Sequence, residues 1–353
     1  MKFLVAVALL GQILGCIAVP VLPNPFSPQF PPCDGDPATE HAAAVAVDHI
    51  NNHNLHGYKY VLNRIEDVKV HPRRPVGKVI FLELDLLETE CPVISPVPVV
   101  NCSVRPQTQH AVEGDCDIKL IDVEGILKVV STKCHSSPDS AEDILRICPD
   151  CPVLSRLNDP GVVKAANAAL STFNAENANG SFYQLIEVSR GYHTYLPVGV
   201  HVEFAIAVTN CSAQEAHDHA ENCHVKTGKH AHFGFCKASV LQKFPRPLDA
   251  AANAPSEDIH VDCTIYDHQA GDAFVHLTEH HLGKNIPSPG IGHTVLNLIH
   301  SHNGTHASHE SHSAEVPVVA ASPVVKRAVV AAVPLPGKLK NQFCPGKIRF
   351  FKV

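Results

Sequence analysis

The sequence predicts an α+β fold of two tandem repeats, each a helix packed on a twisted antiparallel sheet, followed by a largely disordered tail. The first observation is an internal repeat, because residues 46–54 align with residues 169–177 at an offset of 123. The second is the order of the cysteines, which recur as Cys91, Cys102, Cys116 and Cys134, then as Cys211, Cys223, Cys236 and Cys263. The third is the composition after about residue 265, where runs rich in Pro, His and Ser predict no packed core.

A helix pattern opens each repeat. Asp36-Pro37 precedes the apolar run Ala42–Ile50, and Asp159-Pro160 precedes Val162–Phe173. Proline is tolerated at a helix start because its missing N–H has no intrahelical partner there. Strand patterns then follow in the first repeat at Lys59–Val70, Val79–Glu90, His110–Leu120 and Leu127–Lys133. Each unit is therefore expected to be one helix followed by an antiparallel meander.

The chain divides into a leader, two units and a tail. Met1-Lys2, an apolar run to Leu14 and small residues up to Ala18 are typical of a secretory signal peptide. No later segment has about 18 unbroken apolar residues, so we expect no transmembrane segment. The expected divisions are a signal peptide at 1–18, an N-terminal extension at 19–32, a first unit at 33–136, a linker at 137–152, a second unit at 153–264 and a tail at 265–353.

The cysteines indicate a secreted, disulfide-bonded chain. Removing Cys16 with the leader leaves 12 of the 13 cysteines, an even number. The simplest pairing is local, as Cys91–Cys102, Cys116–Cys134, Cys211–Cys223 and Cys236–Cys263. Cys148 and Cys151 lie between the units, whereas Cys33 and Cys344 lie at the extremes, where a bond would close the whole chain. Spacing alone does not decide these pairings.

Composition and motifs exclude several functional classes. The formal net charge is -7 and no strongly basic patch occurs, so nucleic acid is not an expected partner. Nucleophile-elbow, P-loop and dinucleotide motifs do not occur. His309-Glu310-Ser311-His312 is one residue short of the zinc-protease motif. We expect a monomer without enzymatic activity that requires no cofactor.

Four segments carry a resemblance to a known family, namely Leu87–Cys91, His110–Asp117, Ser136–Asp143 and Cys344–Arg349. A helix, strands and two consecutive disulfide loops resemble the cystatin layout. Two such units with a distant C-terminal cysteine resemble the fetuins, so the chain is identified as a member of the fetuin family of the cystatin superfamily. The resemblance covers residues 33–264 and the extreme C-terminus. It implies a plasma glycoprotein with two cystatin-like domains, and two-chain forms, cut at a site such as Lys326-Arg327, held by a Cys33–Cys344 bridge.

Strand periodicity places carboxylates on one face of the first unit's sheet, because alternate residues share a face. They are Glu83, Asp85, Glu88, Glu90, Glu113, Asp115 and Asp117, with a phase slip at Leu87 bringing Glu88 and Glu90 onto that face. Carboxylate oxygens suit Ca²⁺, although such a strand face is often merely solvated. The second unit has Ala205, Val208, Asn210, Phe233, Phe235 and Lys237 at matching positions, so the fold does not require acid there. With the resemblance, which implies inhibition of mineral growth, we expect these carboxylates to bind calcium and calcium phosphate.

Protease inhibition is the first alternative. The hairpins at 73–77 and 195–199 lack the Gln of the cystatin inhibitory motif, so we expect no papain-type inhibition. Cys148-Pro149-Asp150-Cys151-Pro152 is a zinc half-site, a redox pair or a small disulfide ring, and secretion favours the ring. It resembles the linker by which some fetuins block astacin-like metalloproteases, with Asp150 meeting the catalytic zinc. The other interpretation is a rigid staple between domains.

Histidines and modifications complete the candidates. Zn²⁺ or Cu²⁺ binding is an alternative function for the histidine-rich tail, against a plain solvated linker. The tail histidines are His300, His302, His306, His309 and His312. Sequons predict glycosylation at Asn179 and Asn303, and less strongly at Asn101 and Asn210, which precede cysteines. Ser140 lies before acid in a loop-like segment, and the resemblance implies phosphorylation there and, less strongly, at Ser136 and Ser137.

Overall fold

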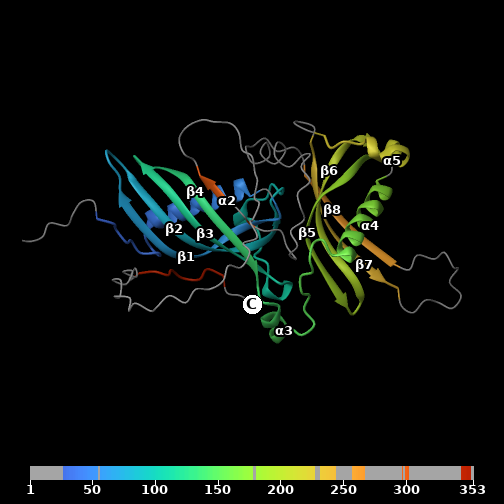
Figure 1. Ribbon diagram of the computed structural model, residues 1–353, viewed down its shortest axis with the longest axis horizontal. Coiled ribbons are helices and arrows are strands. Elements are labelled where there is room, and N and C mark those ends of the chain that lie inside the picture. Colours follow the sequence, from blue (N-terminus) through green and yellow to red (C-terminus); the bar gives the residue numbers. More distant parts are fainter. Residues whose placement is uncertain are drawn as a thin grey trace, which may run out of the picture.

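The protein folds as two similar units that lie side by side, joined by a linker (Figure 1). A computed structural model describes residues 27–54, 56–177, 180–226, 231–243, 257–266, 296, 299–301 and 343–350. The expected signal peptide, Asn179, Asn303, the histidines from His302 to His312 and Lys326-Arg327 lie outside these residues. No helix of the described residues is long and apolar enough to cross a membrane.

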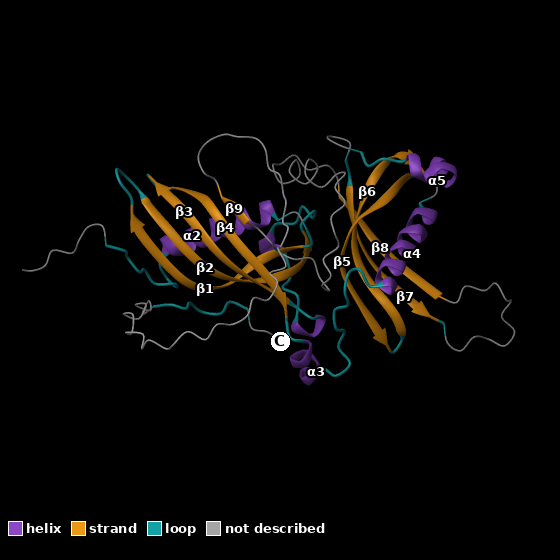
Figure 2. Cartoon of the chain, in the orientation of Figure 1, coloured by secondary structure: helices purple, strands orange, loops and turns teal. Residues whose placement is uncertain are grey.

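The first unit is one helix on an antiparallel sheet (Figure 2). The helix α2 (Pro37–His53) is followed by β1 (Tyr58–Pro72), β2 (Lys78–Pro92), β3 (Val112–Val123) and β4 (Ile126–Pro138). Two 3₁₀ turns, η1 (Val99–Asn101) and η2 (Gln107–Gln109), lie between β2 and β3. The sheet order is β1-β2-β3-β4-β9, where β9 (Ile299–Ser301) comes from the tail.

The second unit repeats this plan. The helix α4 (Pro160–Glu176) precedes β5 (Ser181–Tyr195), β6 (Val198–Ser212), β7 (Phe233–Gln242) and β8 (Glu257–Tyr266), paired in that order. The helix α5 (Ala213–His219) and the turn η3 (Ala220–Asn222) stand between β6 and β7. The α+β fold of two tandem helix-on-sheet units is confirmed.

Both long helices start where the aspartate-proline pairs predicted. Asp36 accepts a hydrogen bond from the Thr39 backbone N–H at 2.9 Å, and Asp159 accepts one from Gly161 at 2.8 Å. Such caps contribute about 1 kcal/mol each. Half of the buried residues of α2 are alanines, and their small side chains let the helix pack closely on Leu82, Leu84 and Leu86 of β2.

A repeated asparagine ties each helix to the first strand of its sheet. Asn51 donates to the Tyr60 carbonyl at 2.8 Å and accepts from the Tyr60 N–H at 2.7 Å. Asn174 makes the same pair of bonds with Tyr183, at 2.9 and 3.0 Å. These bonds explain why Asn and Tyr recur in both repeats.

The structure contains all six expected disulfides, with Cα–Cα distances of 4.1–5.7 Å. Four close local loops within the units, and Cys148–Cys151 forms a small ring in the linker. Cys33–Cys344 joins residues 311 positions apart. Of the pairings that spacing left open, the ring and the bond that closes the chain are therefore the ones present.

Three described stretches of the tail lie against the first unit. Leu296 is buried in the first core, and β9 pairs with β4. Arg349 forms an ion pair with Glu40 of α2 at 2.7 Å, beside the Cys33–Cys344 bond. The composition of the tail did not predict that Leu296 packs into the first core, where the missing Cβ of Gly114 leaves room for its side chain.

Candidate functional site

The acidic side chains of β2 and β3 lie on the face of the first sheet that points away from α2. On β2, Leu82 and Leu84 are 1% and 2% exposed and face the helix, while Glu83 between them is exposed. On β3, Asp115 and Asp117 are exposed, and the residues between them are buried. The predicted alternation therefore holds from Leu82 to Asp85 on β2 and from Glu113 to Asp117 on β3.

The strand register sets these carboxylates opposite one another. Glu83 pairs with Asp117 and Asp85 pairs with Asp115 across β2 and β3, and Glu113 lies one row further, opposite Leu87. Same-face residues recur about every 7 Å along a strand, and opposite residues lie about 5 Å apart. Five carboxylates thus form a two-dimensional array, which we call the acidic face. Its members are Glu83, Asp85, Glu113, Asp115 and Asp117.

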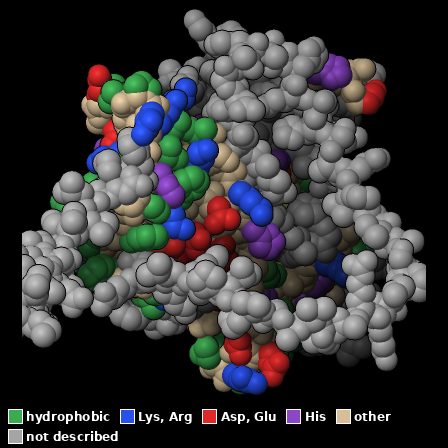
Figure 3. Space-filling view, turned by 60° about the vertical axis from the view of Figure 1, so that its left-hand side comes forward, with side chains coloured by type: hydrophobic (Ala, Val, Ile, Leu, Met, Phe, Trp, Pro, Cys, Tyr) green, Lys and Arg blue, Asp and Glu red, His purple; other side chains and the backbone are tan. Residues whose placement is uncertain are grey.

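A groove of about 290 Å³ lies on this face. Its charged lining comes from four strands and consists of Glu66, Glu83, Asp115, Asp117, Lys133 and His135. Figure 3 shows acidic side chains gathered in the middle of this view, with lysine, arginine and histidine beside them. Sequence reasoning missed Glu66, because bulges on either side of Ile65 break the two-residue period of β1.

The ionised form of Asp85 is disfavoured in the array. Burial raises the pKa of Asp85 to about 6, against a hydrogen bond from Asn63 Nδ2 at 2.9 Å that lowers it. Glu113, Asp115 and Glu66 raise the pKa further, because like charges disfavour ionisation. A bound cation would relieve this repulsion.

The acidic face is an array and not a chelate. Among the described residues, no three His, Cys, Asp or Glu side chains converge where one metal ion could be held. A single Ca²⁺ site needs six to eight oxygens around one point. The geometry therefore suits a surface that presents many cations better than it suits one tightly held ion.

The prediction for Glu88 is wrong, because this carboxylate is buried and paired. The ladder between β1 and β2 runs without a shift from Leu86 to Glu88, so the phase slip at Leu87 does not occur. Glu88 therefore shares the side of Leu86 and is 1% exposed. Glu90 lies beyond, near a bulge, and its Oε1 accepts a long 3.5 Å bond from Gln109. The structure places neither side chain with the acidic face.

Glu88 belongs to a buried ionic network that joins the two units. Its Oε1 accepts from Arg105 Nε at 2.9 Å and from Arg190 Nη1 at 2.7 Å, and Arg190 comes from β5 of the second unit. Arg105 also reaches Glu203 of β6 at 3.3 Å, and the Tyr58 hydroxyl donates to the same carboxylate. Burial raises the pKa of Glu203, but Arg105 and the Tyr58 hydrogen bond outweigh it and hold the pKa below its usual value. Two acids and two arginines balance, as burial of charge requires.

The corresponding face of the second unit docks against the first. Phe235 occupies the position matching Asp115, and its ring meets Tyr58 edge-on at 5.7 Å. Phe233, matching Glu113, is buried in a cluster that includes Ile94 of the first unit. The same sheet face is therefore an apolar interface in one unit and a charged surface in the other.

The linker carries Asp150 in an exposed position. Asp150 lies within the Cys148–Cys151 ring, directly after the helix α3 (Ala141–Ile147). The His110 ring makes a hydrogen bond on each side of this ring segment, an arrangement that we call the clasp. Its Nδ1 accepts from the Leu154 N–H at 2.9 Å, and its Nε2 donates to the Asp139 carbonyl at 2.8 Å. Burial lowers the pKa of His110, which favours the neutral ring that this clasp requires. His110 was predicted to open a strand, but it has a left-handed backbone before β3.

The predicted modification sites differ in access. Ser140 is exposed at the residue before α3, where its side chain makes no capping hydrogen bond, and Ser137 is exposed on β4. Ser136 is 3% exposed and its Oγ accepts from the Leu296 N–H at 2.8 Å, so its prediction as a phosphorylation site is wrong. The loop-like segment expected here is instead the end of β4 and a short helix.

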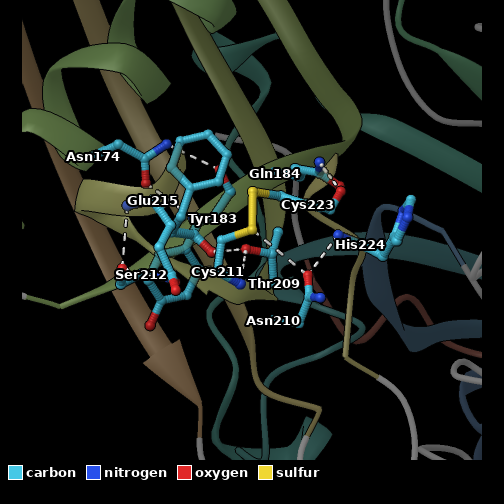
Figure 4. The surroundings of a disulfide bond; sticks show 11 residues. Asn174, Tyr183, Gln184, Thr209, Asn210, Cys211, Ser212, Glu215, Cys223 and His224 are labelled. Atoms are coloured by element: carbon cyan, nitrogen blue, oxygen red, sulfur yellow. Dashed lines mark hydrogen bonds between the residues drawn. A yellow bond between two sulfur atoms is a disulfide. The ribbon is translucent and has the colours of Figure 1, made fainter. Parts of the chain in front are cut away.

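The two glycosylation sites that were predicted less strongly, Asn101 and Asn210, lie beside disulfide bonds. Asn101 is exposed, whereas the Asn210 Oδ1 accepts from the His224 N–H at 2.7 Å, beside the Cys211–Cys223 bond (Figure 4). This hydrogen bond is made by Oδ1 and not by Nδ2, the atom to which a glycan would attach, so glycosylation at Asn210 stays a prediction. His300 lies in β9, opposite Thr132. Metal binding by His300 and by the other tail histidines stays a prediction.

Comparison with known proteins follows this architecture. A family model described as the cystatin domain matches residues 151–244. Antihemorrhagic factor cHLP-B of Gloydius brevicauda is 48% identical over 356 residues, and alpha-2-HS-glycoprotein of Bos taurus is 42% identical over 381 residues, with 100% of each chain covered in both cases. The chain belongs to the fetuin family. The expected likeness of this fetuin to alpha-2-HS-glycoprotein, or fetuin-A, is confirmed.

Solved structures agree with this fetuin over both units. The inhibitory complex of human meprin beta with mouse fetuin-B matches with a TM-score of 0.57 and 25% identity, covering 69% of this chain and 76% of that chain. Mouse fetuin-B in complex with crayfish astacin matches with a TM-score of 0.55 and 25% identity, covering 69% and 74%. The two units of this fetuin are thus tandem cystatin-like domains.

Proposed function

We propose that this fetuin is a secreted plasma glycoprotein that binds calcium and calcium phosphate and inhibits mineral growth through its acidic face. The observation that carries this proposal is the register that sets Glu83 opposite Asp117 and Asp85 opposite Asp115 on the solvent side of the sheet. Hard carboxylate oxygens spaced over a surface suit the calcium ions of a mineral. The role is binding, without catalysis.

The contrast between the domains supports this proposal. Phe235 and Phe233 show that the same sheet accepts aromatic residues at the positions of Asp115 and Glu113. The first domain has carboxylates at these positions, although burial raises the pKa of Asp85 and so disfavours its ionised form. A ligand that carries positive charge would relieve the repulsion between these carboxylates.

Neutralisation tests the proposal. The variant Asp115→Asn/Asp117→Asn is compared with Glu142→Gln/Asp143→Asn, which removes the same charge from the exposed helix α3. Precipitation of calcium phosphate is followed by turbidity against protein concentration. The first pair should raise the concentration needed for half inhibition by about ten-fold, and by no more than about 30-fold, because each of the two exposed ion contacts contributes up to about 1 kcal/mol. Equal behaviour of the two pairs would overturn the proposal.

Inhibition of an astacin-like metalloprotease is the second candidate, favoured by the exposed Asp150 in its disulfide ring. The structural relatives include fetuin-B bound to meprin beta and to astacin, and the sequence relatives include several antihemorrhagic factors. A carboxylate on a rigid loop is a suitable ligand for a catalytic zinc. Asp150→Asn should weaken inhibition of crayfish astacin, whereas Asp143→Asn on the neighbouring helix should not. Unchanged inhibition by Asp150→Asn would leave the ring as a staple.

A further inference from the structure

A row of cationic side chains borders the acidic face. Lys69 of β1 pairs with Phe81 of β2, which pairs with Lys119 of β3. This row is the next one along the same side of the sheet after the row that holds Glu83 and Asp117. On the neighbouring strand, Lys133 of β4 lies directly opposite Asp117 and is exposed.

The ammonium groups of two of these lysines, Lys69 and Lys119, lie beside aromatic rings. Lys119 Nζ lies 5.7 Å from the Phe81 ring centroid, and Lys69 Nζ lies 5.7 Å from that of Phe30. Within the described part of the chain, no carboxylate forms an ion pair with Lys69, Lys119 or Lys133. A cation over a ring keeps its other donor directions open to solvent.

The second domain shows that the fold does not require this row. Its equivalent row is Tyr192, His201 and Ser239, set by the same register. There the Tyr192 and His201 rings stack at 4.9 Å, and Ser239 bonds to His201 Nδ1 at 2.7 Å. In the second domain the row is therefore made of neutral groups that contact one another, whereas in the first domain it carries two half-buried lysines.

We propose that Lys69, Lys119 and Lys133 form a phosphate-binding border of the acidic face, so that one surface engages both the calcium and the phosphate ions of a mineral. This inference rests on the proposed function and names the second ion that the face binds. Lysine is a point-charge ligand for phosphate oxygens, and carboxylates beside it take the calcium between those phosphates. Alternating charge over adjacent rows resembles a salt surface more closely than a purely acidic strip does.

Charge removal that leaves the carboxylates untouched tests the border. The variant Lys69→Gln/Lys119→Gln is compared in the full chain with Lys164→Gln/Lys243→Gln, which removes the same charge from exposed positions of the second domain. Two probes are used, adsorption to hydroxyapatite crystals and binding of Ca²⁺ alone, followed with a calcium electrode. Lys69→Arg/Lys119→Arg serves as the charge-preserving rescue.

The expected result is a loss of hydroxyapatite affinity of about five-fold for the border variant, with Ca²⁺ binding unchanged or stronger and with affinity restored by arginine. The control pair should retain its affinity for the crystals. If the border and control variants adsorb equally well while Asp115→Asn/Asp117→Asn adsorbs poorly, the border is wrong and the acidic face stands. If the acidic variant also adsorbs like the native protein, the proposed function itself is wrong.

Discussion

Glu88 was expected on the acidic face but lies buried in the ionic network between the two domains. Glu88→Gln keeps the shape of the side chain and removes its charge. Arg105 and Arg190 would then share the single carboxylate of Glu203, in a site where Glu88, Arg105 and Arg190 are 1–3% exposed. Removing one partner of a buried ion pair costs about 3–5 kcal/mol, because a charge is left without compensation.

The loss should appear in stability and not in mineral binding. A change of about 3–5 kcal/mol corresponds to a fall in Tm of about 6–20 °C for a chain of this size. Thermal and urea unfolding followed by circular dichroism measure it. Glu90→Gln on the same strand is the matched control, expected to change the free energy of unfolding by less than about 0.5 kcal/mol, because Glu90 makes only a long contact with Gln109.

The outcome of mineral assays decides between two views of Glu88. At 25 °C the folded Glu88→Gln protein should inhibit calcium phosphate precipitation as the native chain does. A variant with unchanged Tm but reduced inhibition would refute the network and return Glu88 to the acidic face.

Three further predictions follow from the ionisable groups and the long disulfide. The folded pKa of Asp85 is raised to about 6, so its ionised form destabilises the fold, and Asp85→Asn should have a higher Tm than the native protein above pH 6. This difference in Tm should disappear as the pH falls from about 6 to about 4, and the variant should bind calcium more weakly at pH 7. Equal Tm values for the variant and the native protein at pH 7 would contradict the prediction. Burial lowers the pKa of His110, whose charged neighbours are Arg190 and Asp139, so the native protein should lose stability as the pH falls below about 6.5. The urea midpoint of His110→Gln should fall less than that of the native protein over the same pH range. Cys33→Ser/Cys344→Ser should lower the free energy of unfolding by up to about 5 kcal/mol, measured by urea unfolding, and a loss below about 1 kcal/mol would show that Arg349 and its neighbours hold the C-terminus without the bond.

Regular strands made much of the acidic face predictable from sequence. Between Glu113 and Asp117, and between Glu83 and Asp85, β3 and β2 pair without a register shift, so the two-residue period places each side chain correctly. Glu66 escaped because two bulges in β1 interrupt that period.

Other features depend on contacts that no local pattern records. Glu88 is paired with Arg190, which lies 102 residues away, so its burial comes from the docking of two domains. Strand alternation without a slip places Glu88 on the side of Leu86, as observed, whereas the expected phase slip at Leu87 placed it with the other acids. Leu296 likewise enters the first core from a segment whose composition gave no sign of packing.

The two copies of the fold show why the acidic face is available to a partner. In the second domain, Phe233 and Phe235 bury the equivalent face against the first domain, gaining apolar burial at little desolvation cost. The first domain cannot be covered in this way, because burying ionised carboxylates costs several kcal/mol each unless opposite charge meets them. Only a partner that brings cations at many points offsets that cost. An ionic solid would do so without needing a pocket, and this is the physical argument for proposing a mineral surface as the partner of an open, extended array.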